Sequence, residues 1–126
     1  IDGKVVYCTN LPWIDAMKLL KSSNVLAVPS RMESLPTNIK EAFFLKIPVV
    51  ATNVGGIPEL VSHNKTGILI PSEDSIQLSN EVNKILKNKE SYNEIIENAH
   101  EFVINEMSWE KILPKYLKFY ENLLNN

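Results

Sequence analysis

The segment Val28–Glu59 reads VPSRMESLPTNIKEAFFLKIPVVATNVGGIPE, and its pattern of strand, loop and helix decides the fold. Val25–Val28 is a short apolar run that leads into this segment and is followed by a proline. This pattern predicts a buried strand. Pro36 suits the first position of a helix, where its missing N–H costs nothing. The helix is expected to bury one apolar face, made by Ile39, Ala42 and Phe43. The pattern therefore predicts a strand, a loop and a helix in that order.

Two carboxylates lie on either side of the predicted helix start. Glu33 falls in the loop that leaves the strand, and Glu41 lies about one turn inside the helix. The backbone N–H groups of Leu35, Thr37 and Asn38 lie where the helix dipole favours an anion by about 0.3 to 1 kcal/mol. Charged acceptors bind hydroxyl groups well, and parallel sheets bind ligands at the carboxyl ends of their strands. A loop of this kind can bind a nucleotide sugar; the alternative, which two isolated glutamates favour, is a pair of solvated surface residues.

The next strand and its loop follow directly. Val49–Ala51 is predicted to be a strand, and Thr52–Gly56 is its carboxyl-end loop. Gly55 and Gly56 allow a backbone to approach a ligand closely, and the alternative is a plain tight turn. Ile57–Glu59 then opens a short helix, and residues 68–70 predict a further strand.

The amino-terminal region predicts one more strand and a helix. Lys4–Thr9 favours a strand, followed by a loop at residues 10–12 and a covering helix over Trp13–Lys21. Cys8 is expected to be a buried small hydrophobe, because no histidine or second cysteine lies near it in the sequence.

From Glu73 onward the sequence predicts helices. Two amphipathic helices are followed by a last helix, which Ser108 can cap and which Pro114 should kink. The apolar stripe of this last helix is wider than one core face needs. Its members are Trp109, Ile112, Leu113, Tyr116, Leu117, Phe119, Tyr120, Leu123 and Leu124. Such a stripe suits a segment that leaves its own domain.

Composition narrows the class of protein. A chain of 126 residues with 44% hydrophobic residues can bury one core, so a single domain is expected. The net charge of -2 argues against nucleic acid as a partner. The single cysteine allows no internal disulfide and favours a reducing cytoplasmic setting. A membrane-spanning helix needs about 20 apolar residues, and no apolar run in the sequence approaches that length. No metal is expected, because neither paired histidines at helical spacing nor a CxxC motif occurs.

The segment PSRMESLPTNIKEAFFLKIPVVATNVGGIPELV resembles the signature of retaining glycosyltransferases of the GT-B fold, which include glycogen synthase and bacterial mannosyltransferases. The matching elements are Pro29-Ser30, Glu33, Pro36, Glu41-Ala42, residues 48–51, Gly55-Gly56, Glu59, Thr66-Gly67 and Pro71. The resemblance implies an α/β fold, with a Rossmann-like parallel sheet flanked by helices. Residues 1–126 would be a partial donor-binding domain, the C-terminal half of a GT-B fold, with terminal helices over residues 73–126.

The resemblance also implies roles for single residues. Glu41 would bind the ribose hydroxyls of the nucleotide, and Glu33 would bind the hydroxyls of the donor sugar. Backbone amides from Ser34 to Thr37 would contact the sugar and the diphosphate; Pro36 has no N–H, so Leu35 and Thr37 are the better donors. Glu33 is the candidate catalytic residue, in a binding role that we prefer to a covalent one.

Two loops are given weaker roles by the same resemblance. Gly55 and Gly56 would lie near the donor sugar and diphosphate. Asn10 and Leu11 would lie beside the nucleotide base, although Asn-Leu-Pro is also an ordinary turn before a helix.

For the whole enzyme, the resemblance implies transfer of a hexosyl group from a nucleotide sugar to an acceptor hydroxyl with retained configuration. No cofactor or metal is expected, and the chain alone should be inactive because the acceptor-binding amino-terminal domain is absent. The expected location is the cytoplasm. The alternative is that the full enzyme associates peripherally with the inner membrane surface. The alternatives are a non-catalytic nucleotide-sugar-binding module, a module that self-associates as a dimer through its last helix, and a GT-B sugar-nucleotide epimerase.

The sequence departs from the family pattern at two places. Phe43–Lys46 replaces the small residues and the glycine that usually end the helix, so Ile47-Pro48 is predicted to end it instead. The strands that usually lie between those at Val5 and Val25 are also missing, which leaves the first strand without its neighbours.

Overall fold

The sheet has three parallel strands. In the computed structural model, which describes residues 5–125, these are β1 (Leu26–Val28), β2 (Val49–Thr52) and β3 (Ile68–Ile70). They are ordered β1-β2-β3, with Leu26 opposite Val49 and Val50 opposite Ile68. The predicted parallel sheet is therefore confirmed.

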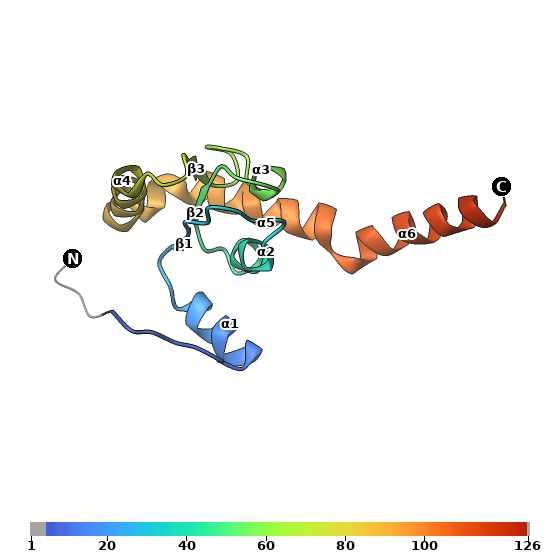
Figure 1. Cartoon of the computed structure of the whole chain (residues 1–126), viewed down its shortest axis with the longest axis horizontal. Helices are drawn as coiled ribbons and strands as arrows, with labels where there is room; N and C mark the ends of the chain where they lie inside the picture. The colour runs from blue at the N-terminus through green and yellow to red at the C-terminus, as the bar shows by residue number, and fades with distance from the viewer. Residues whose placement is uncertain (1–4, 126) are drawn as a thin grey trace.

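Helices follow the strands and end the chain (Figure 1). Within the described part of the chain, the helices are α1 (Trp13–Lys21), α2 (Thr37–Phe44), α3 (Ile57–Leu60), α4 (Ser75–Lys87), the short 3-10 helix η1 (Lys89–Tyr92), α5 (Asn93–Met107) and α6 (Trp109–Leu124). Pro36 is the residue before α2 rather than its first residue, a shift of one position from the prediction.

The core divides into two layers on the two faces of the sheet. Alternate residues of β2 point to opposite faces, as strand geometry requires. Val49 and Ala51 pack with α2, α3 and α5 on one face, whereas Val50 packs with α4 and β3 on the other. All four residues of β2 are buried, so this strand is the centre of the core.

The strand predicted over Lys4–Thr9 is wrong for its described part. Val5–Thr9 has no strand pairing, and Tyr7 is 91% exposed. Lys4 lies outside the described residues. A strand needs a partner for its backbone groups, and the described sheet does not extend to this segment. Cys8 is exposed as well, contrary to the buried position that we predicted.

The end of α2 also differs from the prediction. Lys46, the second residue after the end of α2, has a left-handed backbone with a φ of 58°. The Ile47 N–H donates to the Ala42 carbonyl at 2.8 Å, and the Lys46 N–H donates to the Phe43 carbonyl at 3.1 Å. This pair of bonds is the Schellman motif, which usually has glycine at the left-handed position. The left-handed helix end that usually needs glycine is thus formed here with Lys46. The prediction that Ile47-Pro48 ends the helix is wrong.

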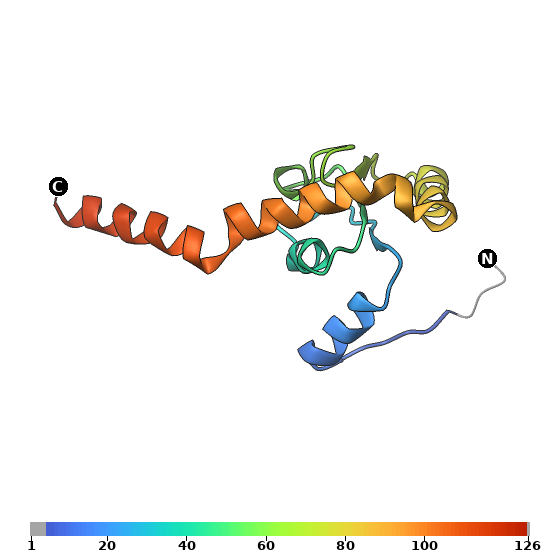
Figure 2. The same cartoon turned by 180° about the vertical axis from the view of Figure 1, so that it is seen from behind.

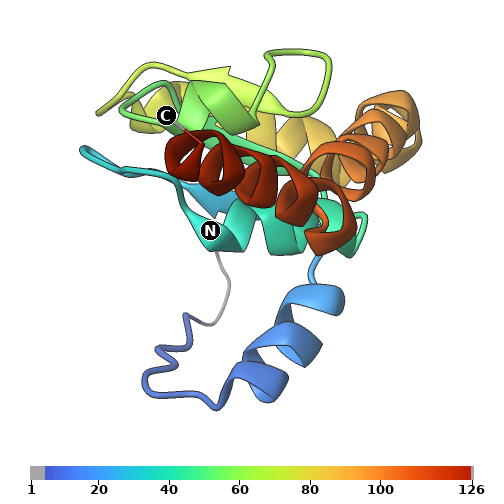
Figure 3. The same ribbon diagram turned by 90° about the vertical axis from the view of Figure 1, so that its right-hand side faces the viewer.

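The last helix projects away from the sheet. Figures 1 and 2 show α6 running beyond the end of α5, with a bend between the two helices, and Figure 3 views the molecule from the end of α6. The bend falls at Ser108, whose ψ is 152°, and the Ser108 side chain makes no capping hydrogen bond. No residue of α6 is buried, and Trp109 is 74% exposed. The apolar stripe of α6 therefore faces solvent.

Candidate functional site

The carboxyl ends of β1 and β2 are tied together by a buried threonine. Thr52 ends β2 and is 2% exposed. Its hydroxyl donates a hydrogen bond of 2.6 Å to the carbonyl of Ser30, in the loop that leaves β1. A buried hydroxyl needs a partner, so this bond fixes the start of the loop that carries Glu33.

The two glycines of the β2–α3 loop lie against the Glu33 loop. The Gly56 N–H donates to the Glu33 carbonyl at 3.3 Å. A Cβ atom on Gly55 would overlap the Glu33 carbonyl oxygen, and one on Gly56 would overlap that of Ser34. Gly55 also has a φ of 54°, in the left-handed region. In the structure, these two glycines therefore approach the backbone of the other candidate loop, and their approach to a ligand stays a prediction.

Glu33 is half-buried and turns back on its own loop. Its Oε1 accepts a hydrogen bond of 2.9 Å from the Ser34 N–H. One of the amides predicted for the donor is thereby occupied by the candidate carboxylate itself. Leu35 is 40% exposed and Thr37 is exposed, while Pro36 between them is buried.

The start of α2 carries free amide donors. The first N–H groups of a helix have no partner within that helix, and the residue before α2, Pro36, has no capping side chain. These N–H groups give the turn between Glu33 and Glu41 a positive character. The predicted order of carboxylate, helix start and carboxylate is present in the fold.

Glu41 is half-buried and accepts a hydrogen bond from a side chain of α1. Its Oε1 accepts a hydrogen bond of 3.0 Å from the indole Nε1 of Trp13. From its sequence, Trp13 is expected only to begin a covering helix, so this contact was not predicted.

Glu41 lies between two hollows. The first, here called the base-side hollow, measures about 320 Å³ and is lined by Cys8, Leu11, Leu26, Asn38 and Glu41, together with residues of α1. The second, here called the indole-side hollow, measures about 300 Å³ and is lined by Trp13, Met17, Lys40, Glu41, Phe44 and Leu45. The base-side hollow thus joins Leu11 of the predicted base loop to Glu41. Asn10, which has a φ of 55°, is not among its lining residues.

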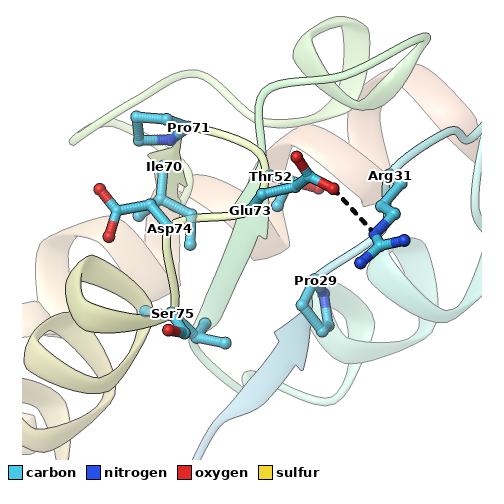
Figure 4. A pocket seen from close by; sticks show the side chains of 9 residues that line it. Pro29, Arg31, Thr52, Ile70, Pro71, Glu73, Asp74 and Ser75 are labelled. Carbon is cyan, nitrogen blue, oxygen red and sulfur yellow. Dashed lines mark ion pairs between the residues drawn. The ribbon is translucent and has the colours of Figure 1, made fainter.

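A third hollow lies at the carboxyl ends of all three strands (Figure 4). It measures about 270 Å³, and its walls include Pro29, Thr52, Ile70 and Pro71. An exposed ion pair also lines it, with Arg31 Nε 3.1 Å from Glu73 Oε1. Sequence reasoning did not predict this hollow, because Arg31 and Glu73 lie far apart in the chain.

Residues 5–125 lack two features that would indicate other classes of protein. No three histidine, cysteine, aspartate or glutamate side chains in that range are grouped to hold a metal ion. In the same range, none of the helices combines the length and the apolar character that crossing a membrane requires.

Known proteins resemble this chain over most of its length. Residues 1–102 match the profile of the family described as Glycosyl transferases group 1. The chain is 31% identical over 109 residues to N-acetyl-alpha-D-glucosaminyl L-malate synthase of Bacillus anthracis, covering 86% of the chain and 29% of that protein.

Solved structures give the same result. Sucrose-phosphate synthase from Thermosynechococcus elongatus is 30% identical with a TM-score of 0.80, covering 85% of this chain and 27% of that one. HepE from Anabaena, in complex with UDP, is 25% identical with a TM-score of 0.79, covering 83% and 29%. The chain spans under a third of the length of these relatives. Its Rossmann-like sheet with flanking helices is that of GT-B glycosyltransferases. The chain therefore belongs to the glycosyl transferases group 1 family.

Proposed function

We propose that this chain, residues 1–126, is the donor-binding part of a retaining glycosyltransferase and that it binds a nucleoside-diphosphate sugar. The observation that carries the proposal is the start of α2, which falls along the chain between the half-buried carboxylates Glu33 and Glu41. The complexes of the similar protein HepE with UDP and with UDP-glucose support a nucleotide sugar as the ligand class. Membership of the family supports transfer of its sugar to an acceptor.

The two carboxylates would hold the two hydroxyl-rich ends of the donor. Glu41 would accept hydrogen bonds from the ribose, and Glu33 from the sugar that is transferred. Gly55 and Gly56 would act indirectly, by supporting the backbone of the Glu33 loop. Leu11 would contact the base from the base-side hollow, and Asn10 would shape the turn that presents it.

The amides at the start of α2 would stabilise the departing diphosphate. Ser34 N–H is engaged by Glu33, so Leu35 and Thr37 are the donors of choice. Stabilisation of a leaving group by fixed N–H dipoles is an electrostatic effect that requires no proton transfer. We therefore propose metal-independent transfer in which Glu33 orients the sugar rather than attacks it. The acceptor site would belong to an amino-terminal domain of a longer protein.

Isothermal titration calorimetry of the chain with UDP, GDP and their sugars tests the proposal. Glu41→Ala should weaken binding by at least about tenfold, since a hydrogen bond to a charged group contributes about 1.5 to 3 kcal/mol. Glu94→Ala, which removes an exposed carboxylate from α5, is the matched control and should bind as the unmodified chain does. Absence of binding to every nucleotide would overturn the proposal.

The exposed face of α6 favours a second candidate, self-association of the chain. Leu113, Leu117, Tyr120 and Leu124 recur at helical spacing, and all four are exposed. Two copies could cover this face by packing their α6 helices together. Sedimentation equilibrium should then give a dimer, and Leu117→Glu should give a monomer. A monomeric unmodified chain at high concentration would exclude this candidate.

A further inference from the structure

The indole of Trp13 contacts the candidate ribose-binding carboxylate through a specific bond. Its Nε1 donates to Glu41 Oε1 at 3.0 Å, and the two residues lie 28 positions apart on α1 and α2. Trp13 is 67% exposed, so burial of apolar surface explains little of its position. An indole N–H is only a donor, and a carboxylate is only an acceptor when ionised, so the bond has one direction.

This bond engages one carboxylate oxygen of Glu41 and leaves the other available to a ligand. No described residue donates a hydrogen bond to Glu41 Oε2. A free glutamate side chain samples several rotamers, and fixing it costs conformational entropy. The indole bond restricts this sampling before a ligand arrives. A ligand that binds Glu41 would therefore meet a carboxylate that is already oriented.

The two hollows indicate which side the ligand occupies. Trp13 lines only the indole-side hollow, whereas Leu11 and Asn38 line only the base-side hollow. Glu41 lines both. Since Oε1 is bonded to the indole, Oε2 is the oxygen of Glu41 that is left to serve a group in the base-side hollow.

We propose that Trp13 is a positioning residue, which holds Glu41 through Oε1 so that Oε2 accepts a hydrogen bond from the 2′-hydroxyl of the ribose. The inference rests on the proposed function, because it needs a nucleotide as ligand. It adds a residue of α1 to the determinants that distinguish ribonucleotides from deoxyribonucleotides.

The test compares the affinities of UDP and 2′-deoxy-UDP, or of GDP and 2′-deoxy-GDP if GDP binds more tightly. The unmodified chain should prefer the ribonucleotide by about tenfold, the effect of one hydrogen bond to a charged group. Trp13→Phe keeps an aromatic ring and removes the N–H donor, and it should reduce the preference to threefold or less. If Trp13 contributed only to stability, the variant would lower the affinities for both nucleotides equally and leave the ratio of the two affinities unchanged.

Two further variants complete the experiment. Trp109→Phe removes the other of the two tryptophans, on α6, and should leave the preference intact. In that variant Trp13 is the remaining tryptophan, so its fluorescence should change on addition of the nucleotide. In a Glu41→Ala background, Trp13→Phe should have no further effect on the preference.

The outcomes separate the inference from the proposed function. An unmodified chain that prefers the ribonucleotide, together with a Trp13→Phe variant that keeps the same preference, overturns the inference alone. Equal affinity of the unmodified chain for both nucleotides also overturns it, while nucleotide binding still stands. Absence of any nucleotide binding overturns the proposed function before the variants are compared.

Discussion

The backbone of Gly55 lies against the backbone of Glu33 so closely that a Cβ atom on the glycine would overlap the Glu33 carbonyl oxygen. The contact joins the loop after β1 to the loop after β2. Glu33 and Gly55 are 22 positions apart in the sequence. Since Gly55 also has a φ of 54°, two independent constraints require glycine there. The position of Glu33 thus depends on a residue that carries no side chain.

Gly55→Ala should therefore lower both stability and donor affinity. The left-handed backbone alone costs about 1 to 2 kcal/mol for a residue with a Cβ atom, and the overlap must move the Glu33 loop. Urea denaturation measures the first effect, and calorimetry with the nucleotide sugar measures the second on the folded protein.

Gly67→Ala is the matched control for that variant. A Cβ atom there would lie 2.9 Å from Val61 Cγ1, so the fold should again lose stability through crowding. Gly67 does not contact the Glu33 loop, and donor affinity should be retained. Equal losses of affinity in the two variants would contradict the role given to Gly55.

Thr52→Val should loosen the start of the same loop. The substitution keeps the shape of the side chain and removes the hydroxyl that donates to Ser30, which should cost about 1 to 2 kcal/mol of unfolding free energy. The loop should also gain amide hydrogen exchange at residues 31–34.

Thr66→Val separates loop effects from a general loss of stability. Thr66 is the other buried threonine, and its hydroxyl accepts from the Ser62 N–H at 2.9 Å, away from Glu33. Its loss should cost similar stability and leave exchange at residues 31–34 unchanged. If Thr66→Val increased that exchange as much as Thr52→Val, the local explanation would fail.

The sequence predicted those elements whose signals are local. The bounds of Trp13–Lys21 and the strand at Ile68–Ile70 agree with the structure, because hydrophobic spacing and turn residues define both. Lys4–Thr9 has an equally good strand pattern, yet Val5–Thr9 forms none. The difference is pairing, which depends on residues distant in sequence and cannot be obtained from the segment itself.

The candidate site shows the same division. The positions of Glu33 and Glu41 around the start of α2 followed from Pro36 and the apolar spacing after it. The bond from Trp13 to Glu41 could not be predicted, because it depends on how α1 packs on α2. Likewise, the contact of Gly55 with the Glu33 backbone could not be predicted, because it depends on how the loops after β1 and β2 meet.

Lys46 offers a direct measure of the energy of the unusual helix end. Lys46→Gly and Lys46→Ala both remove the exposed ion pair with Glu97, in which Nζ lies 2.6 Å from Oε2. Only the glycine variant relieves the left-handed backbone. Lys46→Gly should therefore be more stable than Lys46→Ala by about 1 kcal/mol in urea denaturation. Equal stability would show that the left-handed conformation at this position costs nothing.

The start of α6 should respond to acid through Glu110. Its own backbone N–H, and then the Ser108 hydroxyl, hold the pKa of Glu110 below its ordinary value of 4.5. A group whose pKa is lower in the folded protein stabilises the fold above its unfolded value and loses that contribution as the pH falls through the folded value. The first turn of α6 should thus weaken below pH 4.5, and Glu110→Gln should remove this dependence.

Carboxyl NMR titration checks the cause. Ser108→Ala should raise the pKa of Glu110 toward 4.5, because one of its two donors is lost. Ser91→Ala is the control, since the Ser91 hydroxyl donates to the Asn88 carbonyl and does not involve Glu110. A Glu110 carboxyl that titrates at the same pH in the unmodified chain and in Ser108→Ala would contradict the assignment. The expected upward shift would instead identify the Ser108 hydroxyl as a donor that stabilises the first turn of the exposed helix.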